Sequence, residues 1–116
     1  MKRFLFFSVV LAMVAAPAFA ADAKIERTWK SKCASCHGKD GKSDTDKGKQ
    51  LKVNDMTASD YTKKFTDEQM KKAILNGVNE ERDGVKKEME PYKDELKPDQ
   101  IDGLIVFIKG LSKPAK

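Results

Sequence analysis

Apolar residues recur at helical spacing in three stretches of the chain, and polar stretches separate them. The stretch near the C-terminus is the best marked of the three. Pro98 suits the first position of a helix, Asp99 favours its positive end, and Gly110 is typical of its end. Helical spacing predicts that the buried stripe of this helix includes Ile101, Leu104, Ile105 and Ile108.

Two further helices are predicted over 23–32 and 66–77, together with a short helical turn over 60–65. The helix over 66–77 has clear signals at both ends. Thr66 and Gln69 fit a capping box at its start. An Asn-Gly pair supplies a left-handed stop at its end.

The remaining stretches lack the apolar alternation that a half-buried strand requires. Residues 39–55 are rich in Gly, Asp and Lys, which predicts an irregular loop. Residues 78–95 show neither helical spacing nor strand alternation of apolar residues. A connection of that length without regular structure in a small domain usually has a function. The pattern therefore predicts an all-α fold in one domain, with three main helices plus a short helical turn.

The N-terminal segment has the form of an export signal. A basic start is followed by an uncharged, mostly apolar run over 4–16 and by the small-x-small sequence Ala-Phe-Ala at 18–20. The apolar run is shorter than the roughly 20 residues that a membrane-spanning helix needs. We therefore expect a cleaved signal peptide over 1–20, a mature domain over 21–116 without stable membrane insertion, and a periplasmic location.

The mature domain is expected to be mildly basic. Without Lys2 and Arg3, 21 of the 23 basic residues remain against 18 acidic ones, which gives a formal charge of +3. The lysines are scattered among the acids, with no Arg-rich or aromatic-interleaved run. This pattern is typical of a solvated surface and predicts no nucleic-acid partner.

One motif carries the candidate chemistry. Cys33-Ala34-Ser35-Cys36-His37 contains both cysteines and the only histidine of the chain. C-x-x-C-H is the pattern of covalent haem attachment. On a helical turn, positions i, i+3 and i+4 lie on one side, so two thiols and one imidazole can converge on a single planar ligand. We therefore predict one haem c, bonded through Cys33 and Cys36, with His37 as an axial ligand of its iron.

Three other interpretations of the motif stay open as less favoured alternatives. A redox-active dithiol would lie beside a strand-helix-strand pattern, for which the chain offers no credible strand. A zinc site would be one N or S ligand short of a closed tetrahedron. A structural disulfide between Cys33 and Cys36 would close too short a loop to stabilise much of the fold.

The second axial position of the iron has no other imidazole to fill it, so a thioether is the natural candidate. Met70 lies on the stripe of a predicted helix, where a methionine is more often a packing residue than a ligand. Met89 lies in a polar run just before Pro91 and has no periodic apolar partner. We predict Met89 as the ligand, with Met56 as the fallback. An open or lysine-bound sixth position is the remaining alternative.

The order of these features resembles the class I cytochrome c family over essentially all of 21–116. That family has a first helix that enters C-x-x-C-H, a glycine-containing loop, a middle helix, a methionine shortly before a proline, and a closing amphipathic helix. The resemblance implies the cytochrome c fold, wrapped around one covalently attached haem. It also implies that Trp29 packs against Phe107 where the first and last helices cross.

The chain departs from the family pattern at two points. Ile25 stands where the family often has a small residue, which implies a less close crossing of the two helices. No proline lies between His37 and Pro91. The family often uses a proline carbonyl there to orient the axial imidazole, so the hydrogen-bond partner of His37 is left open.

The predicted function is electron transfer rather than enzymatic catalysis. With both axial positions filled, the iron can change charge with little change of geometry and offers no site for a substrate. We expect a monomer that meets larger redox proteins through a small, weak contact at an exposed haem edge. Two alternatives are an open-site haem protein, which binds a gas or catalyses a reaction, and a permanent cytochrome subunit of a larger oxidoreductase.

Overall fold

The computed structural model describes residues 18–112. A helical run at its start carries the Cys-x-x-Cys-His motif and consists of three consecutive elements: α1 (Ala18–Thr28), the π-helix η1 (Trp29–Cys33) and α2 (Ala34–His37). The first helix therefore begins earlier than the predicted residue 23. Most of the predicted signal peptide, residues 1–17, lies outside the described residues.

Four more helices follow in the chain: α3 (Asp46–Gln50), α4 (Tyr61–Lys64), α5 (Asp67–Asn76) and α6 (Pro98–Leu111). The capping box at the start of α5 is confirmed, since Thr66 and Gln69 exchange side-chain and backbone hydrogen bonds of 2.9 and 3.2 Å. The short helix α3 lies in a stretch predicted to be an irregular loop. Its first turn is capped by the hydroxyl of Thr45.

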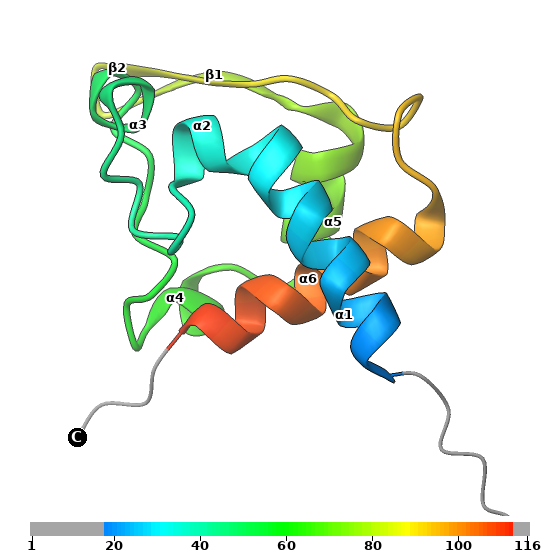
Figure 1. Cartoon of the computed structure of the whole chain (residues 1–116). Coiled ribbons are helices and arrows are strands. Elements are labelled where there is room, and N and C mark those ends of the chain that lie inside the picture. The colour runs from blue at the N-terminus through cyan, green and yellow to red at the C-terminus, as the bar shows by residue number, and fades with distance from the viewer. Residues whose placement is uncertain (1–17, 113–116) are drawn as a thin grey trace, which may run out of the picture.

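The all-α prediction is wrong, because residues 78–89 form a two-stranded antiparallel sheet (Figure 1). Strand β1 (Val78–Arg82) pairs with strand β2 (Val85–Met89), with Val78 opposite Met89 at the open end. The sheet lies between α5 and α6 in the sequence, in the connection that was predicted to have no regular structure.

The physical reason for this error lies in the turn and in the charges of the two strands. Asp83 and Gly84 have φ values of 52° and 74°, as a tight two-residue hairpin turn requires. Acidic residues of β1 stand opposite lysines of β2, Glu80 opposite Lys87 and Glu81 opposite Lys86. Such cross-strand pairs stabilise a hairpin without producing any apolar alternation in the sequence.

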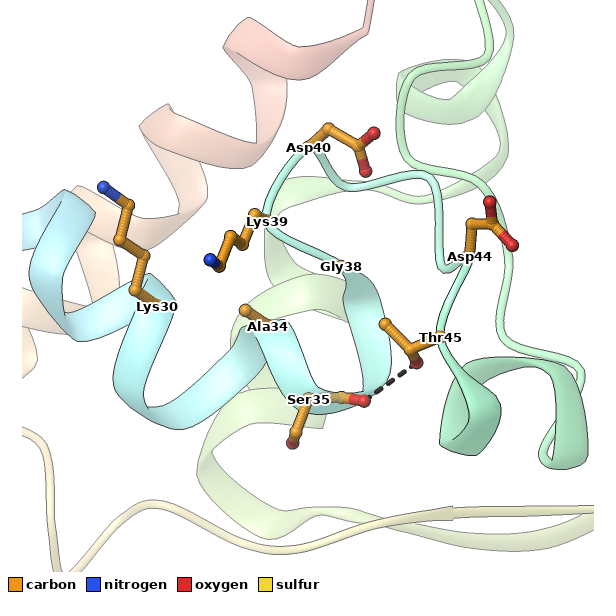
Figure 2. A pocket seen from close by; sticks show the side chains of 8 residues that line it. All are labelled: Lys30, Ala34, Ser35, Gly38, Lys39, Asp40, Asp44 and Thr45. Carbon is orange, nitrogen blue, oxygen red and sulfur yellow. Dashed lines mark hydrogen bonds between the residues drawn. The ribbon is translucent and has the colours of Figure 1, made fainter.

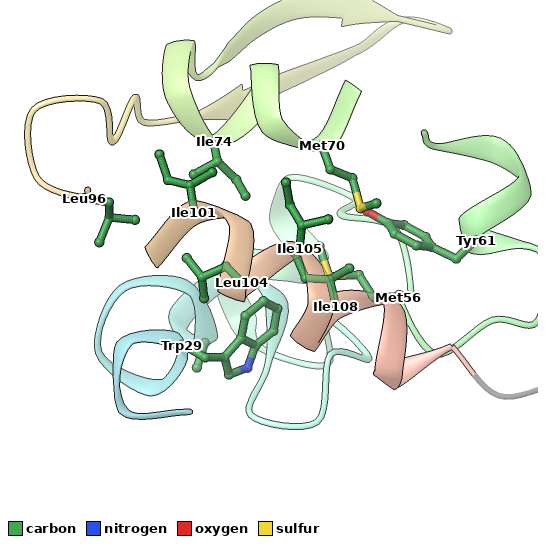
Figure 3. Packing of buried hydrophobic residues seen from close by; sticks show 11 residues of the cluster. Trp29, Met56, Tyr61, Met70, Ile74, Leu96, Ile101, Leu104, Ile105 and Ile108 are labelled. Atoms are coloured by element: carbon green, nitrogen blue, oxygen red, sulfur yellow. The ribbon is translucent and has the colours of Figure 1, made fainter. Parts of the chain in front are cut away.

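The hydrophobic core forms around α6, which contacts both α1 and α5 (Figure 1). Trp29, Ile101 and Leu104 are its most completely buried side chains. Figure 3 shows the indole of Trp29 beside α6 and the side chain of Ile74 from α5 above Ile101. The core also contains Ala34, Met56, Tyr61, Met70, Leu96, Ile105 and Ile108.

The predicted aromatic contact joins η1, the continuation of the first helix, to α6. The rings of Trp29 and Phe107 lie 5.1 Å apart between centroids and are inclined at 44°, which confirms the contact. Ile25 is accommodated by a glycine of α6. A Cβ atom on Gly103 would lie 2.6 Å from Ile25 Cδ1, so a larger residue at position 103 would force the tip of the isoleucine side chain to shift.

Candidate functional site

The predicted attachment residues lie where the helical run changes its geometry. Cys33 is the last residue of η1, while Cys36 and His37 belong to α2. All three side chains are half-buried. The motif therefore does not lie on one regular α-helix, as its spacing had suggested. Gly38 then turns the chain away with a φ of 79°.

A buried indole supports the end of the motif. Trp29 Nε1 donates a hydrogen bond of 3.1 Å to the carbonyl oxygen of Gly38. The Trp29 ring also lies 5.8 Å from the imidazole of His37 between centroids. Because Trp29 is only 1% exposed, it anchors the turn after His37 to the hydrophobic core.

Helix α3 supports the middle of the motif from outside. The hydroxyl of Thr45 donates to the Ser35 carbonyl at 2.8 Å (Figure 2). The same hydroxyl accepts the N–H of Gly48 at 2.9 Å. A Cβ atom on Gly48 would lie 2.4 Å from the carbonyl oxygen of Cys36. Sequence reasoning missed Thr45 and Gly48, although Thr45 followed by an acidic residue is a recognisable helix start.

Burial keeps two groups of the motif uncharged at neutral pH. It raises the pKa of the Cys33 thiol to about 11, an effect that the charge of Lys32 partly opposes. It lowers the pKa of His37 to about 4. His37 is thus a neutral imidazole, which is the form that binds a metal.

The imidazole of His37 has one enclosed nitrogen without a partner. Nδ1 is buried and makes no hydrogen bond within residues 18–112. The described residues therefore supply no acceptor in place of the family's proline carbonyl. A neutral, half-buried imidazole next to two free thiols fits a haem attached through this motif.

The structure gives no support to the three competing interpretations of the motif. Both cysteines are free, so no disulfide joins them. Among residues 18–112, no group of three or more His, Cys, Asp and Glu side chains is placed to hold a metal ion, which argues against zinc. The sheet of the described residues is an antiparallel hairpin rather than the parallel sheet of a thioredoxin-type dithiol.

The three candidate methionines occupy two kinds of environment. Met56 and Met70 are each only 6% exposed and belong to the hydrophobic core. Figure 3 shows Met56 beside Ile108 and Met70 beside Tyr61. Met89 is the last residue of β2, half-buried at the margin of the core, where Cys33 also lies.

The hairpin that ends at Met89 is tied to the region of the motif. Lys87 of β2 donates hydrogen bonds to the carbonyl oxygens of Leu51, at 3.4 Å, and of Lys52, both just after α3. We call η1 and α2, residues 29–37, the attachment helix. Since α3 packs on the backbone of Cys36 and leads directly into Leu51 and Lys52, one continuous segment contacts both β2 and the attachment helix.

An open surface pocket of about 560 Å³ lies beside α2 (Figure 2). Neither the two cysteines nor His37 line it, although Ala34 and Ser35 of the motif do. Its lining combines lysines with aspartates and small residues: Lys30, Ala34, Ser35, Gly38, Lys39, Asp40, Asp44 and Thr45.

A helical run into Cys-x-x-Cys-His, a middle helix, a methionine before a proline and a closing helix crossed by the first form the architecture of a small c-type cytochrome. Residues 20–108 match the family model described as cytochrome c oxidase, cbb3-type, subunit III. The chain belongs to this cytochrome c family. Its cofactor is therefore covalently bound haem c, and its chemistry is haem-based electron transfer.

Solved structures similar to the chain include the following two. The "KustC0563 c-type cytochrome" is 26% identical, with a TM-score of 0.63 over 76% of this chain and 96% of that one. A structure of a Kustc0563 mutant is 26% identical, with a TM-score of 0.58 over 76% of this chain and 98% of that one. No curated protein sequence matches the chain. Within residues 18–112, no helix is long and apolar enough to cross a bilayer.

Proposed function

We propose that the chain carries single electrons in the periplasm on one haem c. Cys33 and Cys36 would form the two thioether bonds, and His37 and Met89 would be the axial ligands. The observation that carries this proposal is the half-buried, neutral His37 beside two free thiols in a chain of the cytochrome c family. When bound, haem c supplies an iron that gains and loses one electron.

Residues around the motif hold His37 in position through contacts that do not involve the haem. Trp29 holds the carbonyl of Gly38 and packs against the imidazole, while Thr45 holds the backbone of Ser35. These contacts reduce the reorganisation that would accompany ligand binding or a change of charge. A rigid site of this kind suits a carrier that must change charge without changing shape.

The different burial of the methionines supports Met89 over the fallback Met56. Met56 is packed among core side chains, and its N–H donates to the carbonyl of Gly41 at 2.9 Å. Moving its thioether to a metal would leave a cavity in the core, at a cost of several kcal/mol. Met89 is half-buried at the margin of the core, so its side chain is less committed to packing.

The ligation is tested by Met89→Ala, with Met56→Leu as the matched control. In the oxidised protein, Met89→Ala is expected to abolish the thioether-to-ferric-iron absorption band and to lower the reduction potential. Met56→Leu is expected to retain the band, because it conserves the apolar volume in the core. Loss of the band in Met56→Leu and its retention in Met89→Ala would assign the ligand to Met56 instead.

Carbon monoxide separates the carrier from the open-site alternative. A filled sixth position is expected to make the reduced wild-type protein bind carbon monoxide poorly, while Met89→Ala binds it readily. Rapid, stoichiometric binding by the wild type would contradict the carrier proposal. It would instead favour a gas-binding or catalytic haem protein.

Export and assembly are tested on the protein from its native host. Cleavage after residue 20 would remove only the first three described residues of α1. We expect the haem-stained protein in the periplasmic fraction, with an N-terminus at residue 21 and the mass of a monomer. The matching family is described by an oxidase subunit, so stable co-purification with a larger oxidoreductase would support the alternative of a permanent subunit.

A further inference from the structure

The segment that follows Met89 is anchored to α5 and to the core. The backbone N–H of Tyr92 donates to the Ile74 carbonyl at 2.8 Å, and that of Lys93 donates to the Leu75 carbonyl at 3.2 Å. Leu96, which is 5% exposed in the core, closes the turn through a 2.9 Å bond from its N–H to the Tyr92 carbonyl. Tyr92 therefore stands at the centre of a fixed turn.

The side chain of Tyr92 extends this anchor to the attachment helix. Its hydroxyl donates a half-buried hydrogen bond of 2.9 Å to the backbone carbonyl of Lys32, which is 60 residues away in the sequence. Lys32 lies in η1, directly before Cys33. The Ala34 N–H bonds to the carbonyl of Trp29, five residues back, and such widened turns are frequent at functional sites.

We propose that Tyr92 is a positioning residue that fixes Met89 against the attachment helix through its hydrogen bond to the Lys32 carbonyl. The inference rests on the proposed ligation by His37 and Met89. Tyr92 would determine how firmly the Met89 thioether binds the iron, without being a ligand itself.

The chain between Met89 and Tyr92 is short and stiff, so a movement of one residue is transmitted to the other. Only Glu90 and Pro91 lie between them, so the two Cα atoms are three steps and at most about 10 Å apart, and the ring of Pro91 fixes its φ. On the other side, Gly77 lies so close to the Met89 carbonyl that an added Cβ would be 2.4 Å from its oxygen. A displacement of Tyr92 therefore passes to Met89 rather than being absorbed by the chain.

The test uses imidazole as a competitor for the sixth position of the oxidised holoprotein. Tyr92→Phe removes only the hydroxyl and keeps the ring, so the fold is retained. We expect imidazole to bind roughly fivefold more tightly to Tyr92→Phe than to wild type, the equivalent of about one hydrogen bond. The thioether absorption band should also disappear at a lower temperature.

Two control variants separate the hydroxyl from other effects. Tyr61→Phe removes the hydroxyl of the other tyrosine, which Figure 3 shows pointing toward Met70. Glu95→Gln breaks the 3.0 Å ion pair between Glu95 and the Lys32 side chain, which joins the same two segments. Each control is expected to leave the imidazole affinity within about twofold of wild type.

A double variant tests whether Tyr92 acts through Met89. In a Met89→Ala background, Tyr92→Phe should change the imidazole affinity by less than about twofold, because no thioether competes there. An equal effect in both backgrounds, or none in the wild-type background, would overturn the inference. A wild-type protein without the thioether band would instead overturn the proposed ligation.

Discussion

Gly77 meets two demands that only a glycine satisfies together. Its φ of 72° ends α5, and its missing side chain makes room for the carbonyl of Met89 and the nitrogen of Pro91. The sequence predicted the first role, since the Asn-Gly pair is a local helix-stop signal. The second role depends on the return of β2 beside α5, which no local pattern of residues encodes.

Gly77→Ala is expected to destabilise the protein more than Gly84→Ala. Both residues have a positive φ, which an alanine rarely adopts, and the ψ of −176° at Gly77 lies in a region that is essentially restricted to glycine. An added Cβ at Gly84 meets nothing within 4 Å, whereas at Gly77 it would lie 2.4 Å from the Met89 oxygen. Only Gly77→Ala should also weaken the thioether absorption band.

Denaturant unfolding of the two glycine variants, followed by haem absorption, makes the comparison. Gly110→Ala is the third member of the series, because residue 110 is helical and an added Cβ meets nothing within 4 Å. It should be neutral or slightly stabilising. Equal losses of unfolding free energy in Gly77→Ala and Gly84→Ala would show that the close approach to Met89 has no energetic weight.

The elements differ in how far the sequence alone could predict them. Helices α5 and α6 were predicted because capping residues and an apolar stripe lie within each segment. The hairpin β1–β2 was missed because its strands carry charged residues, although Asp83-Gly84 is itself a strong hairpin-turn signal. At the site, the residue types of Cys33, Cys36 and His37 could be recognised, but not the supports from Trp29 and α3.

The docking of α3 on the attachment helix gives a prediction for this element. Gly48→Ala would place a Cβ 2.4 Å from the carbonyl oxygens of both Cys36 and Ser43, so α3 must move outward. We expect a loss of about 1–3 kcal/mol in the free energy of unfolding, the usual cost of overpacking. Lys49→Ala, an exposed position on the same helix, should lose less than about 1 kcal/mol.

Thermal and denaturant unfolding of the holoproteins measures this difference. The added methyl group would press against the carbonyl oxygen of Cys36 and displace the backbone there. Gly48→Ala is therefore also expected to broaden or shift the haem circular dichroism signal. If Gly48→Ala were as stable as Lys49→Ala, α3 would not be packed on the motif as the structure shows.

The molecule as a whole depends on apolar contacts more than on its charges. The eight ion pairs of residues 18–112 all join side chains that are at least 35% exposed. Pairs of this kind contribute little to stability, because water already solvates both partners. A domain of this size can bury only a modest core, so the covalently bound haem is expected to supply much additional apolar surface.

Salt is therefore expected to have a small effect on the stability of the holoprotein. Raising NaCl from about 0.05 M to about 0.5 M should change the free energy of unfolding by less than about 1 kcal/mol, because exposed pairs are already weak. Urea unfolding at the two salt concentrations measures the change. A loss of several kcal/mol would mean that the exposed ion pairs contribute far more to the fold than expected, because salt screens exposed pairs and hardly affects buried ones.

The contact between Ile25 and Gly103 has a consequence for how related sequences can vary. The space between α1 and α6 admits one bulky side chain, and here α1 supplies it while α6 supplies the glycine. A methyl group gained on α6 would force the tip of Ile25 to shift, so it is best offset by a methyl group lost on α1. Homologues should therefore conserve the combined volume of the two positions rather than either identity, and Gly103→Ala should be tolerated best alongside Ile25→Val.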